Sequence, residues 1–429
     1  TSIERLSSGY KINGSKDDAA GCAISEKMRA QIRGLSQAQN NTADGVSVLN
    51  TAEGAITEIQ SMLTRLKELS VQAANDVNSD DEREAIQKEI EQINNEIDRI
   101  SDQTEFNTQS LINGNLSRRV YSDLQGVNQL SVSDSYTAGV YGITVTEDAR
   151  QAIAVGAGSI TMSSTASITE EQAGAINING YKISISEGDT LDKVMGKIID
   201  GVNITGGSAF TVKDLNNDTA ANGTDYAGYV PTADYAGSTL VIMTNQYGSD
   251  QKMNITCDNA ELADILGIPQ AATQDGIYVE GSDVKAEIAT GDDGKRIGFA
   301  DSAILSTKGT VITVTDVNNK EFSMDVPGNA AGTVFDDSNN DGQSAAGAGT
   351  TKTISQEVTD VGTMSIHVGA NQDQVIVIDI PAITTYSLGT EHMNVMTQYT
   401  ASRAISTVDE AINKTNDCLL YTSPSPRDK

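Results

Sequence analysis

Residues 49–73, LNTAEGAITEIQSMLTRLKELSVQA, decide the fold of this 429-residue chain. Their apolar side chains recur at spacings of three and four, which is the pattern of a helix that buries one face against a partner helix. The spacing already begins near Leu35, so the sequence predicts one helix from about Leu35 to Ala74, roughly 60 Å long. The apolar seam predicted on this helix is Leu49, Ile56, Ile59, Leu63 and Leu66.

A second helix is predicted after a reversal of the chain at residues 75–78. Ser79 can accept a hydrogen bond from the new helix while Glu82 reaches back to the Ser79 backbone, and together these bonds form a capping box. A second seam follows the reversal, and a weaker third seam lies near the other end of the chain. The second seam is Ile86, Ile90, Ile93, Ile97 and Ile100, and the third is Ala401, Ala404, Val408, Ala411 and Thr415.

A helix cannot bury an apolar stripe by itself, so the N-terminal and C-terminal arms are predicted to pack into a long antiparallel coiled-coil-like rod. The Gly-rich middle carries short alternating runs, such as residues 181–185 and 310–314, which predict a large inserted β-rich domain that projects outward from the rod. A β-hairpin is predicted between residues 364 and 380, and helix resumes from about Thr400. The predicted fold class is therefore α+β.

Composition and charge exclude several classes of function. Lys and Arg total 29 against 59 for Asp and Glu, so the formal net charge is −30 and nucleic acid is not an expected partner. No run of 18 apolar residues is present, so no membrane insertion is expected, and the first residues are unlike a secretory leader. Cys22, Cys257 and Cys418 lack the spacing of a zinc site or of a disulfide framework.

No catalytic motif is found, so the chain is predicted not to be an enzyme and to need no cofactor. His367 and His392 are the two histidines, and a structural or solvent-exposed role is expected for both. Residues 337–342, DSNNDG, fit the first half of a calcium loop, but Ala348 stands where such a loop requires its bidentate acid. A solvated acidic loop is therefore favoured there, and no metal site is predicted.

The two arms carry a series of longer motifs. They are RLSSGYKIN at 5–13, DDAAG at 17–21, ISEKMR at 24–29, LKELSVQAAN at 66–75 and QTEFN at 103–107, followed by VGAN at 368–371, SLG at 387–389 and AISTVDEAI at 404–412. Together these motifs resemble bacterial flagellin, the subunit of the flagellar filament. The resemblance implies a helical core that carries a variable outer domain. Within that domain, INING at 176–180 with DTL at 189–191 is similar, more weakly, to a small repeat of flagellins and hook-associated proteins.

By the same resemblance the chain is expected to be truncated at both ends, because flagellins begin with a further helix of the filament's inner tube and end with its partner. From about Cys418 the sequence resembles a sequencing adapter read in frame. The predicted division is a partial inner-tube and linker segment at 1–18, an N-terminal helical core at 19–115, the inserted variable domain at 116–362, a C-terminal core at 363–417 and a non-native tail at 418–429.

The resemblance also implies recognition residues. Arg65, Leu69 and Glu89 match the positions with which flagellins engage the vertebrate flagellin-sensing Toll-like receptor. Arg65 and Leu69 are i and i+4 neighbours and are expected on one exposed face. An ordinary exposed Arg, a seam-edge Leu and a solvated Glu are the alternative. Subunit contacts are implied in a second region, where solvated helix charges are the alternative. The positions in that region are Asp17, Asp18, Arg29 and Arg33.

The implied function is that of a structural protomer that assembles helically into the extracellular flagellar filament and serves motility. The implied partners are further copies of the chain, the flagellar export machinery, a chaperone, the filament cap, hook-associated junction proteins and the host Toll-like receptor. Because the paired terminal helices are incomplete, the chain as printed is expected not to polymerise. Two alternatives stay open: a filament-borne adhesin or immune ligand that acts through residues 116–362, and an enzymatic insertion.

Overall fold

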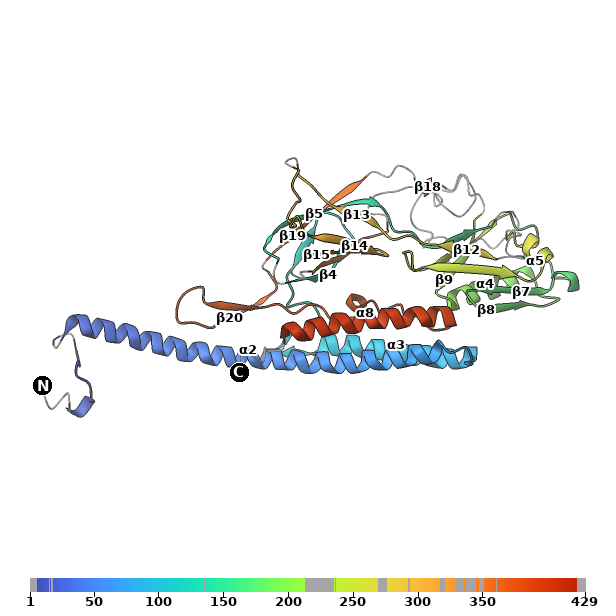
Figure 1. Ribbon diagram of the computed structural model, residues 1–429. Helices are drawn as coiled ribbons and strands as arrows, with labels where there is room; N and C mark the ends of the chain where they lie inside the picture. Colours follow the sequence, from blue (N-terminus) through green and yellow to red (C-terminus); the bar gives the residue numbers. More distant parts are fainter. Residues whose placement is uncertain are drawn as a thin grey trace.

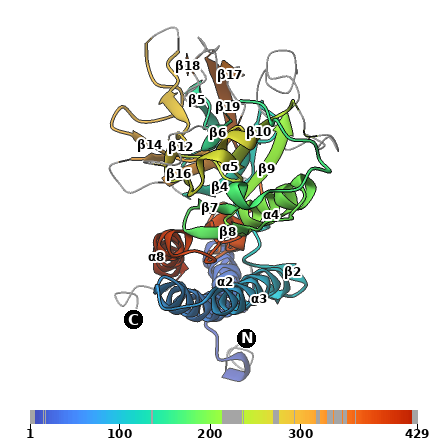
Figure 2. The ribbon, with the colours of Figure 1, turned by 90° about the vertical axis from the view of Figure 1, so that its right-hand side faces the viewer.

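Three helices lie side by side in one elongated bundle, and the β-rich residues lie along one side of it (Figure 1, Figure 2). The computed structural model describes residues 6–14, 16, 18–133, 136–156, 158–212, 235, 237–268, 276–291, 294–316, 321–328, 335–336, 345–346, 351–359 and 361–422.

The longest element is helix α2, Ala19–Ala73, which runs along the bundle and extends beyond it (Figure 1). Its N-terminus is capped by Asp18, whose Oδ1 accepts a hydrogen bond from the Gly21 N–H at 3.1 Å. The helix begins earlier than Leu35 because residues 19–34 contain no proline and keep the helical apolar spacing. The predicted helix is present, and its start lies further upstream than expected.

Helix α3, Asp80–Gln103, returns alongside α2 after the predicted reversal (Figure 1). The Ser79 N–H donates to Glu82 Oε2 at 2.8 Å, and the Glu82 N–H donates to Ser79 Oγ at 3.3 Å, so the predicted capping box is confirmed. Asp80 and Asp81 add negative charge to the first turn, where the helix dipole favours it. Local sequence is therefore sufficient to specify this turn.

Helix α8, Gln398–Thr422, completes the bundle by packing along α2, and a single turn, α7 (Thr385–Leu388), precedes it. Side chains of α2, α3 and α8 share one hydrophobic core, which contains all ten seam residues of the first two helices. Leu49, Ile93 and Ile100 are half-buried and the other seven are buried. The helix continues past residue 417, where the sequence analysis placed the start of a non-native tail. The buried face of α8 is Ala401, Ala404, Val408, Ala411 and Thr415.

The upstream part of α2 lies outside this three-helix core. Leu35, near which the apolar spacing begins, is 55% exposed, so the spacing does not correspond to a buried face at this position. Helices α3 and α8 do not reach this part of α2, and the predicted hairpin lies beside it instead (Figure 1). The hairpin consists of β20, Met364–His367, and β21, Val375–Ile378. Asn41 Nδ2 donates to the His367 carbonyl at 3.0 Å and joins the hairpin to the helix.

The inserted residues form two units with separate hydrophobic cores, where the sequence predicted one domain. The strands of the first unit are β3 Val120–Ser122, β4 Asn128–Val132, β5 Gly139–Glu147, β13 Lys285–Ile288, β14 Ile304–Lys308, β15 Val311–Thr315, β16 Glu321–Asp325 and β19 Lys352–Val358. They make two antiparallel sheets, ordered β13-β5-β19-β3 and β14-β15-β16-β4. The core of this unit includes four aromatic rings, which pack mostly edge to face. These rings are Tyr136, Tyr141, Phe299 and Phe322.

The second unit, residues 149–282, is nested between β5 and β13. Its elements are β6 Ile153–Val155, the 3-10 turn η1 Glu170–Gln172, β7 Gly174–Ile178, β8 Tyr181–Ile185, α4 Leu191–Ile204, β9 Gly207–Val212, β10 Thr239–Thr244, β11 Lys252–Cys257, α5 Ala260–Ile265 and β12 Ile277–Glu280. The sheets are ordered β12-β11-β7-β8 and β6-β10-β9. Helix α4 buries Val194, Met195 and Ile198 in the same core as these strands.

Two very short hairpins and a helical turn at residues 6–8 are also present among the described residues. The strands β1, Glu105–Phe106, and β2, Gln109–Ser110, pair directly after α3. The strands β17, Phe335–Asp336, and β18, Ala345–Ala346, pair within the first unit's sequence.

The chain enters and leaves the insertion at adjacent strands. Strands β3 and β19 pair in antiparallel fashion. Just outside this pairing, the Arg119 N–H donates to the Val361 carbonyl and the Thr359 N–H donates to the Arg119 carbonyl, both at 3.0 Å. The two connections to the helical bundle therefore lie side by side.

The insertion lies against one side of the bundle (Figure 2). Lys308 of the first unit pairs with Glu410 of α8 at 2.5 Å. Asn394, just before α8, donates from Nδ2 to the Ile204 carbonyl of the nested unit at 2.9 Å. These contacts join charged and polar groups, which the sequence pattern does not reveal as partners.

Asp189 organises the start of α4 in the nested unit. Its buried carboxylate accepts hydrogen bonds from Lys193 Nζ at 2.7 Å, from Lys197 Nζ at 2.6 Å and from the Ser186 N–H at 3.0 Å. The two lysines and the backbone N–H hold the pKa of Asp189 far below its usual range.

We expect Asp189→Asn to lower the melting temperature of the nested unit at pH 7, because Asn supplies no charge for the two ammonium groups. A carboxyl whose pKa is depressed by folding stabilises the fold above its unfolded pKa of about 3.9, and this contribution is lost as the pH falls toward the folded pKa. Calorimetry at pH 7 and at about pH 2.5 should therefore show the difference between the two proteins narrowing in acid. Glu187→Gln, at a nearby exposed position, is the control. An equal difference at both pH values would contradict the assignment.

Candidate functional site

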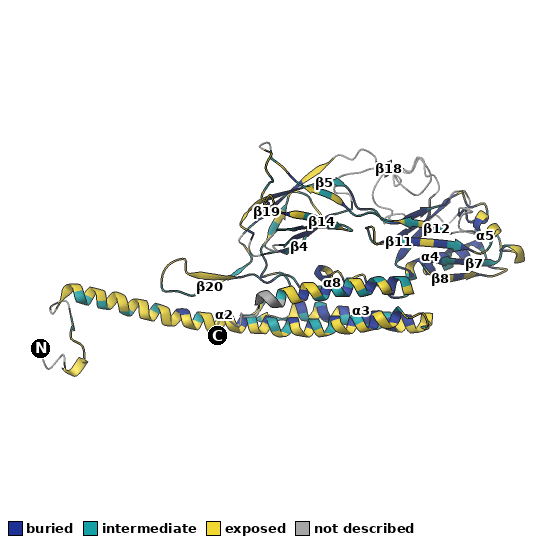
Figure 3. Ribbon diagram, in the orientation of Figure 1, coloured by how far each residue is buried: buried dark blue, intermediate teal, exposed yellow. Residues whose placement is uncertain are grey.

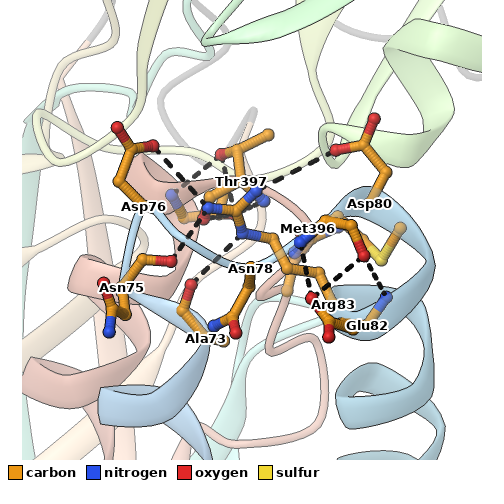
Figure 4. Close-up of polar contacts among 12 residues, drawn as sticks. Ala73, Asn75, Asp76, Asn78, Asp80, Glu82, Arg83, Met396 and Thr397 are labelled. Carbon is orange, nitrogen blue, oxygen red and sulfur yellow. Dashed lines mark hydrogen bonds and ion pairs between the residues drawn. The ribbon is translucent and has the colours of Figure 1, made fainter.

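Arg83 holds the tip of the bundle, where α2 turns into α3 (Figure 4). Its side chain is almost fully buried, with 7% of the residue exposed. Its Nε donates to the Ala73 carbonyl and its Nη2 to the Asn75 carbonyl, both at 3.2 Å. The carboxylates of Asp76 and Asp80 each lie 3.9 Å from the guanidinium. One side chain therefore satisfies carbonyls at the end of α2 that the helix itself leaves unpaired.

The three residues implied in receptor recognition lie close together but differ in exposure. Arg65 donates from Nη2 to Glu89 Oε1 at 2.7 Å and from Nη1 to Glu68 Oε2 at 3.0 Å, so an exposed ion-pair cluster joins α2 to α3. Leu69 is 1% exposed and belongs to the core, so the expectation that it shares the exposed face of Arg65 is wrong. It follows Leu66 by three residues and continues the buried seam.

The residues implied in subunit contacts lie at the start of α2. Asp18 caps the helix, and Arg29 pairs with Glu26 at 2.7 Å and lies over the ring of Tyr10 at 4.7 Å. Arg33 is exposed on the same helix. Asp17 lies outside the described residues. These described charges sit on the part of α2 that extends beyond the bundle.

The same part of α2 is largely exposed (Figure 3), and its exposed side chains include an apolar stripe. Its members recur at spacings of four, four and three, so they share one helix face. Exposed apolar side chains that share one helix face are candidates for contact with a partner. Strand β21 of the neighbouring hairpin exposes further apolar side chains. The stripe is Ile24, Met28, Ile32 and Leu35, and the strand adds Val375, Ile376 and Val377.

The described residues show little else that suggests chemistry. No three His, Cys, Asp or Glu side chains among them are grouped to hold a metal ion. No helix in this part of the chain is long and apolar enough to cross a membrane. His367 and His392 are exposed, and burial raises the pKa of the Cys257 thiol. The partial calcium loop at 337–342 lies outside the described residues.

These features define an elongated helical bundle in which one helix extends beyond the others and exposes apolar side chains. Residues 1–117, which include α2 and α3, match the family model of the bacterial flagellin N-terminal helical region. Curated relatives of the chain are also flagellins. A flagellin of Clostridium tyrobutyricum is 39% identical over 219 residues, which cover 45% of this chain and 58% of that flagellin. A flagellin of Shigella flexneri is 32% identical over 340 residues, which cover 76% of this chain and 59% of that flagellin. The resemblance to bacterial flagellin is confirmed.

The chain spans about half the length of the curated relatives it matches. Among solved structures, the D1-D2-D3 domains of the Escherichia coli flagellar cap protein FliD align with 85% of this chain and 69% of that chain at 12% identity. The TM-score of this alignment is 0.31.

Proposed function

We propose that the chain is a structural protomer of the bacterial flagellar filament, extracellular and non-enzymatic, with a role in motility. The observation that carries the proposal is the flagellin match over residues 1–117, because these residues supply two of the three helices of the bundle. In this proposal the bundle acts as an antiparallel coiled-coil-like rod. The shared core of α2, α3 and α8 gives such a rod its stiffness.

The exposed stripe of α2 is the proposed contact between copies of the chain. A contact between two different surfaces of the same protein does not close on itself and builds an open helical fibre. The charges of Asp18, Arg29 and Arg33 on the same stretch of helix would set the register of that contact. The export machinery, a chaperone, the filament cap and the hook-associated junction proteins are the further partners we propose, on the strength of the flagellin resemblance.

The test is to express the full-length gene from which this sequence comes, rather than the printed residues alone, in a bacterium whose own flagellin gene is deleted. Filaments sheared from these cells should contain peptides from residues 19–73 and 398–411, identified by mass spectrometry. Cells that carry filaments without these peptides, or that export the protein only as monomer, would overturn the proposal.

Recognition by the flagellin-sensing Toll-like receptor is a further part of the proposal. Arg65 and Glu89 supply its polar contacts, since their ion pair lies on the outer surface of α2 and α3. Leu69 acts from beneath this surface by fixing the backbone that carries Arg65.

We expect Arg65→Ala to reduce receptor signalling by roughly tenfold, because a charged hydrogen-bond donor is lost from the surface. A reporter cell line that carries the receptor gives the readout, and circular dichroism checks that the fold is retained. Arg99→Ala removes a similarly exposed arginine of α3 and should leave signalling unchanged. Equal signalling by the Arg65 variant and the unmodified chain would refute the assignment.

A filament-borne adhesin that acts through the insertion is the second candidate function. A polar cleft between the nested unit and α8 favours this candidate.

A further inference from the structure

A cleft of about 370 Å³ lies where the nested unit meets the C-terminal arm. The end of β10 and the start of β11 form one wall, with Asn245, Gln246 and Lys252. The first turns of α8 form the other wall, with Tyr399 and Arg403. This volume is within the range of small-molecule sites, roughly 300–1,000 Å³. The cleft thus exists only while the insertion lies against the bundle.

The charge of this cleft is opposite to that of the chain. Among the described residues that line the cleft, the basic side chains are Lys252, Arg403 and His392. No Asp or Glu is present among these lining residues. The chain as a whole carries a formal charge of −30. Lys252 pairs with Glu280 at 2.8 Å and His392 Nε2 lies 3.9 Å from Glu391 Oε2, whereas Arg403 donates to the neutral Gln251 side chain. Arg403 is therefore the basic group on which the argument for an anionic ligand rests. A cationic cleft on an acidic protein favours a negatively charged ligand.

The hydrogen bonds within the cleft occupy side-chain oxygen atoms, which are acceptors, and leave side-chain N–H groups, which are donors. Arg403 Nη1 donates to Gln251 Oε1 at 3.2 Å, and Gln251 Nε2 donates to Gln246 Oε1 at 3.2 Å. Ser208 Oγ donates to Asn245 Oδ1 at 2.6 Å. The amide N–H groups of Asn245 and Gln246 and the other N–H groups of the Arg403 guanidinium are therefore the donors that the cleft presents.

One aromatic side chain gives the cleft an apolar surface. The Tyr399 OH donates to the Asp250 carbonyl at 3.3 Å, so the ring is fixed at its outer end. A fixed tyrosine ring can pack against the C–H face of a sugar, while carboxamides bond its hydroxyl groups. An inorganic anion would use the guanidinium but would leave the ring and the carboxamides without a function.

We propose that this cleft binds an acidic sugar, with the sugar carboxylate on Arg403 and its hydroxyl groups on Asn245 and Gln246. The guanidinium is suited to this role because it bonds carboxylates through two parallel N–H groups. The inference does not depend on filament formation, since the cleft belongs to a single chain. Sialic acids and uronic acids share the required chemistry, and the experiment distinguishes them.

The test is isothermal titration calorimetry on the full chain with N-acetylneuraminic acid, glucuronic acid, glucose and sodium sulfate. One or both acidic sugars should bind, with an affinity that falls as salt is added, and glucose should not. Arg403→Gln should weaken binding by roughly tenfold or more. Lys285→Gln, an exposed charge on β13 outside the cleft, is the matched control and should leave binding unchanged.

Arg403 also joins α8 to the nested unit through its hydrogen bond to Gln251. Weaker sugar binding in Arg403→Gln would therefore also follow if the nested unit separated from α8. Asn245→Asp separates the two effects. An aspartate keeps the acceptor for Ser208 Oγ, removes the amide donor and places a negative charge at the cleft. It should abolish binding while the melting temperature stays unchanged. No binding of either acidic sugar, sulfate binding as tight as theirs, or unchanged affinity in Asn245→Asp would overturn the proposal.

Discussion

Leu66→Ala should lower the free energy of unfolding of the helical bundle by about 3 kcal/mol, within the range observed for buried Leu→Ala changes. Leu66 is 0% exposed and lies in the core that α2 shares with α3 and α8. Truncation leaves a cavity that three helices enclose, so the neighbouring side chains cannot close it by moving one element. Urea unfolding followed by circular dichroism at 222 nm measures the loss, because the bundle contains most of the helix.

Val71→Ala is the matched control for this experiment. Val71 lies on the same helix but is 52% exposed, so its truncation should change stability by less than about 0.5 kcal/mol. If both variants lost the same free energy of unfolding, the transition at 222 nm would not measure the stability of the core shared by the three helices.

Arg83→Met should lower the free energy of unfolding by about 2–4 kcal/mol, although methionine keeps much of the apolar stem of the arginine side chain. It removes the donor to the Ala73 carbonyl at the end of α2 and one of two donors to the Asn75 carbonyl, which then keeps only the Asn78 N–H at 3.3 Å. Hydrogen exchange should therefore accelerate most at the turn between α2 and α3, and urea unfolding should show the loss of global stability.

Arg99→Met, on the exposed face of α3, controls for the loss of one positive charge. The Arg99 side chain is 50% exposed, and its variant should leave both measurements near those of the unmodified chain. Faster exchange spread evenly over α2 and α3 would contradict a local role for Arg83.

The helical core could be predicted from the sequence because its signals are local. The capping box needs only Ser79 and Glu82, and the apolar spacing needs only the residues of one helix. The prediction failed where burial depends on the number of neighbours. Leu69 is expected on the exposed face of Arg65, with a seam-edge position as the alternative, but packing among three helices buries it. Leu35 failed in the opposite direction, because no helix among the described residues covers it.

The insertion was less predictable because strand partners are set by distant residues. The alternating pattern predicts the positions of β8 and β15 to within one residue. It does not predict that β5 pairs with β19, because the whole nested unit separates these strands in the sequence. No local pattern separates the two cores. Arg83 was missed for a similar reason: an arginine in the first turn of a helix resembles a solvated charge until the preceding turn folds over it. The cleft beside α8 likewise depends on contacts between residues more than a hundred positions apart.

The neighbouring positions of β3 and β19 have an evolutionary consequence. The chain leaves the helical bundle and returns to it at adjacent positions. The segment between Arg119 and Val361 can therefore be shortened, lengthened or replaced as one unit. The helices would keep their own contacts after such an exchange, because the shared core contains no residue of either inserted unit. The same position offers an engineer a site at which a foreign domain can replace the insertion while the helical core is kept.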